Sequence, residues 1–293
     1  EALRDALTVA ERANRAKSDF LSRMSHEIRT PMNAIVGMTA IAAAHIDDRK
    51  QVQNCLRKIT LSSKHLLGLI NDVLDMSKIE SGKLTLTTEQ ISLKEVVEGI
   101  VNIMQPQVKA KRQTFDIHVE NILTENVWCD GVRLNQVLLN LLSNATKYTP
   151  EGGSIQLSLS EEKSPKGENY VRTHIKVKDN GIGMSPDFLK KIYESYSRAD
   201  GARIHKTEGA GLGMAITKYI VDAMEGTIDI QSEPDKGTEF LLTFDFEKAD
   251  AMNMDMVLPS WNMLVVDDDE LLCRTAVDAL KSIGIKAEWT LSG

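Results

Sequence analysis

The feature that most constrains the fold is a run of residues near the start of the chain whose spacing alternates between three and four. Between residues 21 and 42 these residues are Leu21, Met24, Ile28, Pro31, Ile35, Met38 and Ala42. Such spacing corresponds to positions a and d of a heptad repeat, and it predicts a helix that buries one apolar stripe. The register extends back through polar Asn14 and Lys17 to Leu3, so we expect one helix from residue 1 to about 44. Pro31 fits inside that helix if neighbouring helices support a kink.

His26 lies at position f of this register, furthest from the stripe. Glu27 is its neighbour, and Thr30 lies one turn further on the same face. An exposed imidazole can act as a nucleophile, and an adjacent carboxylate can accept its second proton. A lone histidine in such a place is more often an ordinary solvated side chain, so this interpretation depends on the rest of the chain.

A second helix is expected from about residue 51 to 79, ending near Ser81 and Gly82, where glycine suits a C-cap. Its apolar stripe contains Ile59, Leu66, Ile70 and Val73. Two antiparallel helices cannot bury both stripes alone, so the hairpin is predicted to pair with a second copy as a four-helix bundle, a homodimer. We interpret His45 and His65 as ordinary surface residues of this hairpin.

Length and charge narrow the class of protein. The chain has 293 residues, enough for roughly two domains. Its net charge of −7 argues against a nucleic-acid-binding surface. Cys55, Cys129 and Cys273 are scattered, which fits a reducing compartment better than a disulfide framework or a zinc site. The chain starts at Glu1 inside a helical pattern, so we expect the cytoplasmic portion of a longer protein, whose upstream part could contain a sensor or an inner-membrane anchor.

From residue 83 the pattern changes to helices that alternate with mostly antiparallel strands. Strands are expected at 83–87, 114–119, 127–129, 154–160, 171–178, 227–231 and 238–246. Helices are expected at 91–110, 131–147, 186–194 and 211–224. Asp130 and Ser185 are the predicted N-caps of two of them. This order indicates an α+β two-layer sandwich.

Two stretches in this half could bind a nucleotide through side chains. The first places amide, amine and phenol groups on one helical face, from Asn140, Asn144, Lys147 and Tyr148. Amide oxygens suit Mg2+ and a lysine can meet phosphate, although a polar solvent face would look the same. The second, 179–184, directly follows a strand. Asp179 could accept a hydrogen bond from an exocyclic amine, and Gly181 and Gly183 would let the backbone approach a flat ring, although such a sequence is also a common turn.

Two further stretches are rich in glycine. Gly209, Gly211 and Gly213 open a helix, and glycine-rich backbone at a helix N-terminus can bind an anion. The pattern is weak evidence by itself, because no βαβ unit surrounds it. The second stretch, residues 236–238, stands at the start of the last expected strand, where it also fits a hairpin turn. The polar stretch from about 195 to 208 lies where a lid over a nucleotide would be expected.

Taken in order, these motifs resemble those of the histidine kinases of two-component systems, over residues 16 to about 248. The stretches similar to the H-box, N-box, G1 box, G2 box and final glycine-threonine element are 25–31, 140–148, 179–184, 209–213 and 236–238. The resemblance implies a dimeric helical bundle followed by an ATP-binding sandwich of the gyrase and heat-shock-chaperone type. It divides the chain into 1–15 (signalling helix), 16–82 (phosphotransfer), 83–249 (ATP-binding), 250–260 (linker) and 261–293 (the beginning of a further domain).

The resemblance also implies roles for single residues, with ATP and Mg2+ as cofactors. His26 would take the γ-phosphoryl group on Nε2, Glu27 would accept the Nδ1 proton, and Thr30 would position water during dephosphorylation of a partner. Asn140 would hold Mg2+, and Asp179 would bind the adenine amine. The other residues implied to contact ATP are Asn144, Lys147, Tyr148, Gly181, Gly183, Arg198, Gly209, Gly211, Leu212, Gly213 and Thr238.

The chain departs from the family pattern in two places. Where the family usually has Phe-Glu-Pro-Phe, this chain has Tyr193 to Tyr196 without a proline, which bears on lid packing more than on catalysis. In the G2 box Ala210 replaces the usual threonine.

The end of the chain resembles the opening of a receiver domain. Residues 261–266 are expected to form a buried strand, followed by Asp267, Asp268 and a helix over 271–283. Clustered carboxylates at the carboxyl end of a strand suit Mg2+. The resemblance implies a hybrid kinase that passes its phosphoryl group to a receiver domain in cis or in a response regulator. A C-terminal docking strand is the alternative interpretation of this segment.

For the whole chain, two other functions stay open. One is a related ATPase that hydrolyses ATP to change conformation, and the other is a scaffold that binds nucleotide without transferring phosphate. The ATPase gives no reason for His26 beside Glu27, and the presence of Asn140 and Asp179 argues against the scaffold.

Overall fold

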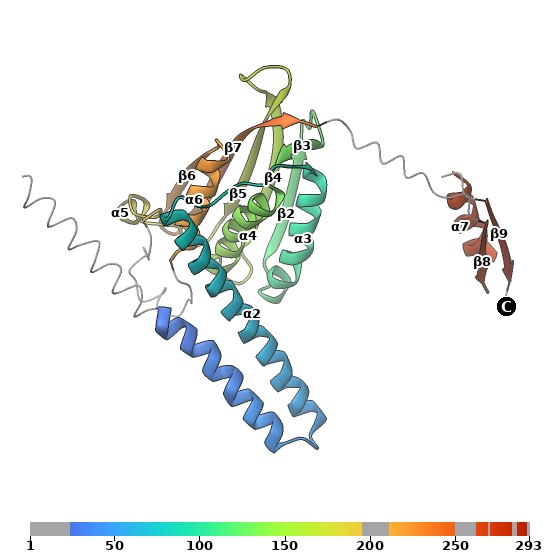
Figure 1. The fold of residues 1–293 in the computed structure, drawn as a ribbon, viewed down its shortest axis with the longest axis horizontal. Helices are drawn as coiled ribbons and strands as arrows, with labels where there is room; N and C mark the ends of the chain where they lie inside the picture. Colours follow the sequence, from blue (N-terminus) through green and yellow to red (C-terminus); the bar gives the residue numbers. More distant parts are fainter. Residues whose placement is uncertain (1–23, 195–210, 250–261, 269, 283–285, 292–293) are drawn as a thin grey trace, which may run out of the picture. The chain divides into compact units, whose positions relative to one another are not determined.

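In a computed structural model of the chain, residues 24–194, 211–249, 262–268, 270–282 and 286–291 are described. The chain forms two compact units, Glu1–Ala249 and Asp250–Gly293. The first contains a helical hairpin and a layered α/β domain, and the second is a small βαβ unit (Figure 1). No helix among the described residues is both long enough and apolar enough to cross a membrane.

The hairpin consists of α1, described over residues 24–44, and α2 (Arg49–Glu80). The predicted heptad stripe is confirmed in this part of the chain, where its residues are buried (Met24, Pro31) or half-buried (Ile28, Ile35, Met38, Ala42). The earlier part of the stripe, up to residue 23, lies outside the described residues. α2 starts two residues before the predicted position because the Asp48 side chain accepts hydrogen bonds from the N–H groups of Lys50 and Gln51.

The end of α2 confirms the predicted glycine cap. Gly82 has a φ of +64°, and the N–H of Lys83 donates to the carbonyl of Lys78 at 2.8 Å, as in a Schellman motif. The strand predicted directly after it, at 83–87, is wrong. The segment is a linker whose Thr87 N–H donates to Asp130 Oδ2 at 2.8 Å, and the strand β1 comes later, at Glu89–Ser92. Alternating residues alone do not distinguish a strand from an extended linker, because a strand also needs a partner.

The α/β domain is a two-layer sandwich, as predicted. Its other strands are β2 (Thr114–Glu120), β3 (Asn126–Cys129), β4 (Ser154–Lys163), β5 (Tyr170–Asp179), β6 (Thr227–Glu233) and β7 (Gly237–Lys248). The sheet has the order β1-β3-β7-β5-β4-β2, with β6 paired to β7. β2 and β4 are parallel, and the other pairs are antiparallel.

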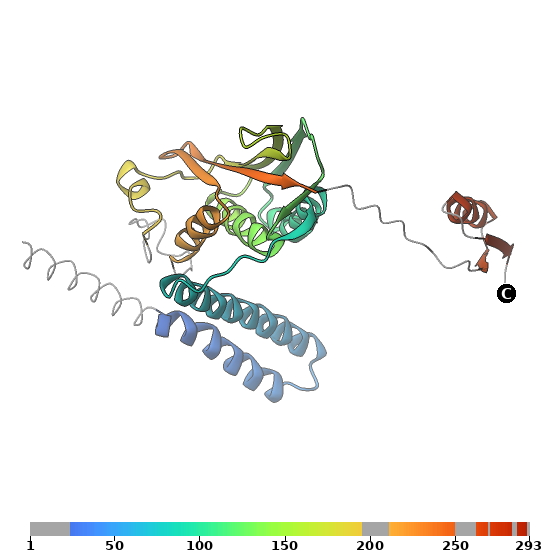
Figure 2. The ribbon, with the colours of Figure 1, turned by 45° about the horizontal axis from the view of Figure 1, so that its top comes forward.

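Three helices, α3 (Leu93–Ala110), α4 (Gly131–Tyr148) and α6 (Gly213–Ala223), cover one face of the sheet (Figures 1 and 2). Every second residue of β4 and β5 points into the core between the layers. The most deeply buried side chains there include Ile100, Met104, Leu134, Leu138, Leu141, Leu142, Ile155, Leu157, Ile220, Leu242 and Phe244. Asp130 caps α4 as predicted, accepting from the Arg133 N–H at 2.9 Å.

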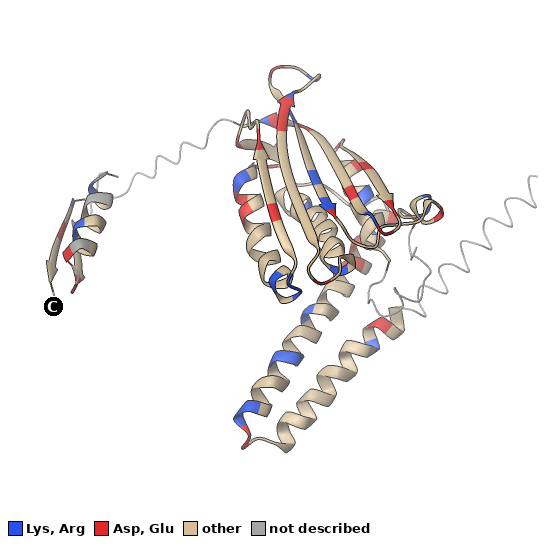
Figure 3. Ribbon diagram, turned by 180° about the vertical axis from the view of Figure 1, so that it is seen from behind, with Lys and Arg blue, Asp and Glu red and all other residues tan. Residues whose placement is uncertain are grey.

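The other face of the sheet is open and polar (Figure 3). Charges of both signs are interspersed there, with Arg172 paired to Asp245 at 2.9 Å and Lys178 paired to Glu239 at 3.3 Å. The alternation of apolar and polar residues in these strands is therefore explained by one covered and one solvated face.

Two predictions about short elements need correction. The helix expected over 186–194 is only the single turn α5 (Pro186–Leu189), although Ser185 caps it as predicted. In the second unit, β8 (Asn262–Asp267) and α7 (Glu270–Ser282) confirm the predicted strand and helix, but the strand is not buried, because Met263, Leu264 and Val266 are 41%, 62% and 49% exposed. A third element, β9 (Lys286–Leu291), was not predicted. β9 pairs in parallel with β8, and its residues alternate between polar and apolar.

Candidate functional site

The first part of the site is a pair of amides on α4. Asn140 and Asn144 lie one turn apart, and Asn144 Nδ2 is 3.5 Å from Asn140 Oδ1. Asn140 Nδ2 donates to Thr217 Oγ1 on α6 at 2.7 Å. The side-chain amides therefore lie between α4 and α6, with the oxygen of Asn140 on the side of Asn144.

The N-terminus of α6 lies beside these amides. Gly211 has a φ of +67°, and the buried Leu212 stands at the N-cap, where its apolar side chain can accept no hydrogen bond. A Cβ atom on Gly213 would lie 2.5 Å from Asn140 Oδ1, so only glycine allows the helix to start this close to the amide. The first N–H groups of an uncapped helix favour an anion, and the neighbouring amide oxygens suit a cation such as Mg2+.

The second part of the site is built around Asp179, at the end of β5. Its side chain is 8% exposed, and Oδ1 accepts the Gly181 N–H at 2.8 Å. Burial raises the pKa of Asp179 above its usual value, and hydrogen bonds from the backbone N–H groups of Gly181 and Thr238 partly offset this. A buried carboxylate with a free oxygen lone pair can accept a hydrogen bond from an amine of a bound ring.

Two glycines allow the backbone segments around Asp179 to come into direct contact. A Cβ atom on Gly183 would overlap the carbonyl oxygen of Glu233, and one on Gly237 would overlap that of Asp179. Both residues also have positive φ angles. The turn after β5 and the start of β7 are thus in direct backbone contact, and side chains at these two positions are excluded.

The end of α4 joins the two parts into one site. The Tyr148 carbonyl oxygen accepts the Ile182 N–H at 3.3 Å, and a Cβ atom on Gly181 would lie 2.6 Å from that oxygen. Lys147 Nζ lies 5.2 Å from the ring centroid of Tyr148, and both side chains are half-buried. The end of α4 is therefore in contact with the turn after β5, and the same helix places Asn140 beside the start of α6.

His26 lies on a separate element, α1. Its side chain is exposed, Glu27 beside it is half-buried, and Thr30 Oγ1 donates to the His26 carbonyl at 3.1 Å. The predicted arrangement of an apolar stripe turned inward and an imidazole turned outward is present here.

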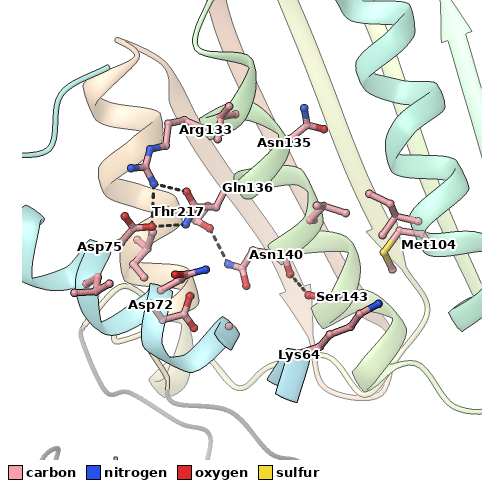
Figure 4. A pocket seen from close by; sticks show the side chains of 18 of the residues that line it. Lys64, Asp72, Asp75, Met104, Arg133, Asn135, Gln136, Asn140, Ser143 and Thr217 are labelled. Carbon is pink, nitrogen blue, oxygen red and sulfur yellow. Dashed lines mark hydrogen bonds and ion pairs between the residues drawn. The ribbon is translucent and has the colours of Figure 1, made fainter. Parts of the chain in front are cut away.

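The hairpin and the α/β domain meet along α2. Asp75 on α2 pairs with Arg133 on α4 at 2.9 Å, and Gln136 Nε2 donates to the same carboxylate oxygen at 2.8 Å (Figure 4). A cavity of about 930 Å³ lies beside this network, lined by α2, α3, α4 and α6, and it reaches Asn140 and Thr217. Asp72 also lines it, and burial together with the charge of Asp75 raises the pKa of Asp72 to about 6.

Two family models match the chain in sequence. Residues 129–248 match the histidine kinase-, DNA gyrase B- and HSP90-like ATPases, and residues 16–82 match the His kinase A phosphoacceptor domain. The first range includes both parts of the site, and the second includes His26. The chain belongs to the histidine kinases. Its α/β domain is accordingly an ATP-binding domain.

Known relatives of this histidine kinase core are much longer proteins. The autoinducer 2 sensor kinase/phosphatase LuxQ of Vibrio vulnificus is 37% identical over 241 residues, which are 82% of this chain and 28% of that protein. The sensory/regulatory protein RpfC of Xanthomonas campestris is 38% identical over 239 residues, 82% of this chain and 32% of that protein. The chain therefore spans about a third or less of the length of these relatives.

Among solved structures, full-length ShkA in complex with AMPPNP is similar to the kinase core with a TM-score of 0.58 and 26% identity, over 92% of this chain and 55% of that one. The complex of histidine kinase ThkA with the response regulator protein TrrA has a TM-score of 0.52 over 80% of this chain and 64% of that one. At 22% identity, the second likeness concerns the fold alone.

Some predicted site residues of the kinase core cannot be placed. Arg198 and Gly209 lie outside the described residues, as do the whole expected lid (195–208) and residues 195 and 196 of the altered aromatic motif. Of that motif, Tyr193 is half-buried, and burial raises its pKa to about 12. In the second unit, Asp267 ends β8 and Asp268 is exposed after it. Within the described ranges, no cluster of three or more acidic, histidine or cysteine side chains is suited to hold a metal.

Sequence reasoning missed two residues that support the site. Thr217 contacts Asn140, and its only sequence signal is its position four residues after Gly213. Ser232 on β6 accepts the Met184 N–H at 2.9 Å and lies 2.9 Å from Thr238 Oγ1, which ties the turn after β5 to β7. A serine in an alternating strand carries no signal of such a role.

Proposed function

We propose that the chain is the catalytic core of a hybrid sensor kinase, in which His26 is phosphorylated from Mg-ATP and the phosphoryl group then passes to an aspartate of a receiver domain. The observation that carries this proposal is the exposed His26 beside Glu27, in the same compact unit as the ATP-binding domain. A simple ATPase would not need this pair.

The geometry of the α/β domain supports the following ATP site. Asp179 would accept a hydrogen bond from the adenine amine, with Gly181, Gly183 and Thr238 shaping the pocket around the ring. The uncapped start of α6, with Gly211, Leu212 and Gly213, would bind the phosphates, and the relative ShkA was solved with the ATP analogue AMPPNP. Asn144, Lys147, Tyr148, Arg198 and Gly209 are the further proposed ATP contacts.

Mg2+ would be held by the side-chain oxygen of Asn140. The residues fit this cation because the Asn140 amide oxygen lies beside the start of α6, where Gly213 has no Cβ atom to block the approach. The N–H groups of that helix start favour the phosphates that would accompany the ion. Bound Mg2+ would neutralise the charge of the phosphates and align them.

The transfer step requires an available imidazole nitrogen. Nε2 of His26 would form a bond to the γ-phosphorus as the bond from that phosphorus to the β–γ bridging oxygen breaks, which releases ADP. Glu27 would accept the Nδ1 proton, so that the ring carries no surplus charge. Thr30, one turn away, would position water when the domain dephosphorylates a receiver, and the relative LuxQ is named a kinase/phosphatase.

We propose a homodimer through the hairpin. One chain leaves apolar side chains of α2 exposed, among them Ile70 of the predicted stripe and, beside it, Leu56, Leu67 and Leu74. A four-helix bundle with a second copy would cover these side chains.

The proposed domains are a signalling helix (1–15), the phosphotransfer hairpin (16–82), the ATP-binding domain (83–249), a linker (250–260) and the first part of a receiver domain (261–293). In that receiver, Asp267 and Asp268 would hold Mg2+. The relatives are several times longer than this chain, which supports a cytoplasmic core in a larger sensor, anchored in the inner membrane through its upstream part.

The proposal is tested by incorporation of γ-labelled phosphate from Mg-ATP. We expect label that is labile in acid and stable in alkali, and that is lost in His26→Gln. His45→Gln is the matched control, because His45 is exposed on the same hairpin and should leave labelling unchanged. Hydrolysis that is unaffected by His26→Gln would favour the ATPase, and nucleotide binding without label would favour the scaffold.

A further inference from the structure

Thr217 is a buried polar residue whose side chain faces the candidate site. It lies on α6, one turn after Gly213, and is 1% exposed. Its Oγ1 accepts a hydrogen bond of 2.7 Å from Asn140 Nδ2, across 77 residues of sequence (Figure 4). The family motifs in this chain do not include it.

This bond distinguishes the two ends of the Asn140 amide. An asparagine side chain has an NH2 group that only donates and an oxygen that only accepts. In the structure the NH2 group faces Thr217, and the oxygen lies on the other side, towards Asn144 and the start of α6. The neighbouring Gly213 leaves little space, since a Cβ atom there would lie 2.5 Å from Oδ1 and 2.9 Å from Nδ2.

The orientation of the amide decides whether it can bind a cation. Mg2+ takes oxygen ligands, so a rotated amide would present its NH2 group and repel the ion. A threonine in a helix can donate its own hydroxyl proton to a carbonyl of the preceding turn, which leaves its lone pairs for an external donor. In the structure the Thr217 hydroxyl accepts the hydrogen bond from the Asn140 amide.

We propose that Thr217 is a positioning residue, which holds the Asn140 amide so that its oxygen faces Mg2+ in the ATP site. The inference rests on the proposed function, in which Asn140 binds this ion. Residues that orient a metal ligand typically change metal affinity by about 10–100-fold when they are replaced.

The test is the Mg2+ dependence of nucleotide binding, measured on the full chain with the non-hydrolysable analogue AMPPNP by titration calorimetry at a series of Mg2+ concentrations. In Thr217→Val, which keeps the shape and removes the acceptor, we expect the half-saturating Mg2+ concentration to rise by about tenfold. Thr217→Ser keeps the hydroxyl and should restore the wild-type value. Affinity for AMPPNP in the presence of EDTA should be the same in all three proteins.

Thr146→Val is the matched control. Thr146 is also a buried helical threonine, but its Oγ1 donates within α4 to the Leu142 carbonyl, so Mg2+ dependence should not change. If Thr217→Val does not fold, Thr217→Cys replaces it, because a thiol of similar size is a weak acceptor and should give the same increase.

The outcomes distinguish a failure of this inference from a failure of the proposed function on which it rests. If Asn140→Ala loses the Mg2+ dependence while Thr217→Val and Thr217→Cys keep it unchanged, Thr217 is only a packing residue and the inference is overturned. If wild-type binding does not depend on Mg2+, the role of Asn140 is itself wrong, and the inference is overturned with it.

Discussion

At the scale of single residues, two carboxyl groups, those of Asp179 and Asp72, lie partly or fully removed from water. Asp179 keeps a buried carboxyl group because two backbone N–H groups donate to it, while Gly183 and Gly237 let the backbone approach it without a Cβ atom. Asp72, on the wall of the cavity beside α2, has a raised pKa as well. Its burial is a cost to folding that a neutral side chain would avoid.

Asp72→Asn should stabilise the chain in a pH-dependent way. Burial and the charge of Asp75 raise the pKa of Asp72 to about 6 from its usual 3.8. Below about pH 4 the group is protonated in the folded and the unfolded chain, so variant and wild type should be alike. As the pH rises from about 4 to about 6, the wild type loses stability relative to the variant, because the folded chain holds the proton longer than the unfolded chain. We expect a loss of only about 1 kcal/mol, since solvent screens the charge of a half-buried group.

Urea denaturation of both proteins between pH 4 and 8 measures this difference. A constant difference across that range would mean that the titration of Asp72 is not its cause. Asp47→Asn, in the exposed turn before α2, is the control and should change little.

At the scale of elements, α2 is attached to the ATP-binding domain by one polar network and an apolar contact. Asp75 contacts both Arg133 and Gln136, and the side chains of Asp75 and Arg133 are 12% and 17% exposed. Val73, Met76 and Ile79 of the same helix pack against the core of the α/β domain. A nearly buried ion pair specifies a contact more than it stabilises it, since both charges have lost their water.

Asp75→Ala should destabilise the chain by about 3 kcal/mol, because it leaves the Arg133 charge buried without its partner. Adding Arg133→Met should recover most of this loss, and a double-mutant cycle on denaturation free energies gives the coupling between the two residues. Glu151→Ala, which breaks the exposed pair with Arg112 at 3.2 Å, is the comparison and should have little effect. Equal effects of Asp75→Ala and Glu151→Ala would show that the network is not a specific attachment.

At the scale of the whole molecule, the single chain leaves apolar surface on its hairpin uncovered. Leu67 is 58% exposed and Ile70 is 41% exposed, although both lie on a helix that already packs against α1 and the α/β domain. A second copy is the proposed cover of this surface.

Leu67→Lys combined with Ile70→Lys should weaken the dimer at least about tenfold, since each chain loses two apolar contacts and gains two charges. Sedimentation equilibrium over a range of concentrations measures the change, and circular dichroism should stay unchanged because both side chains are exposed. Leu123→Lys replaces a leucine that is 54% exposed outside the hairpin, and its dimer should match the wild type. A single-chain mass for the wild type at all concentrations would contradict the dimer.

Much of the fold could be predicted from local patterns. The heptad stripe around His26, the caps at Asp130 and Ser185, and the glycine that ends α2 all depend on residues within one or two turns. The strand expected at 83–87 failed because its hydrogen-bond partner, Asp130, lies more than forty residues away and is a side chain. β9 was missed although its residues, Lys286–Leu291, alternate between polar and apolar.

The sequence by itself determined the helical stripe that leaves His26 exposed, the two-layer class of the second domain, and the set of amide, acid and glycine residues, because periodicity and residue chemistry are local properties. Only the tertiary structure decided that Thr217 holds the Asn140 amide, that Ser232 ties the turn after β5 to β7, and that Asp75 joins α2 to α4. Each of these contacts joins residues far apart in the chain, and their partners are set by how α2, α4, α6 and the sheet pack, which no spacing along the sequence records.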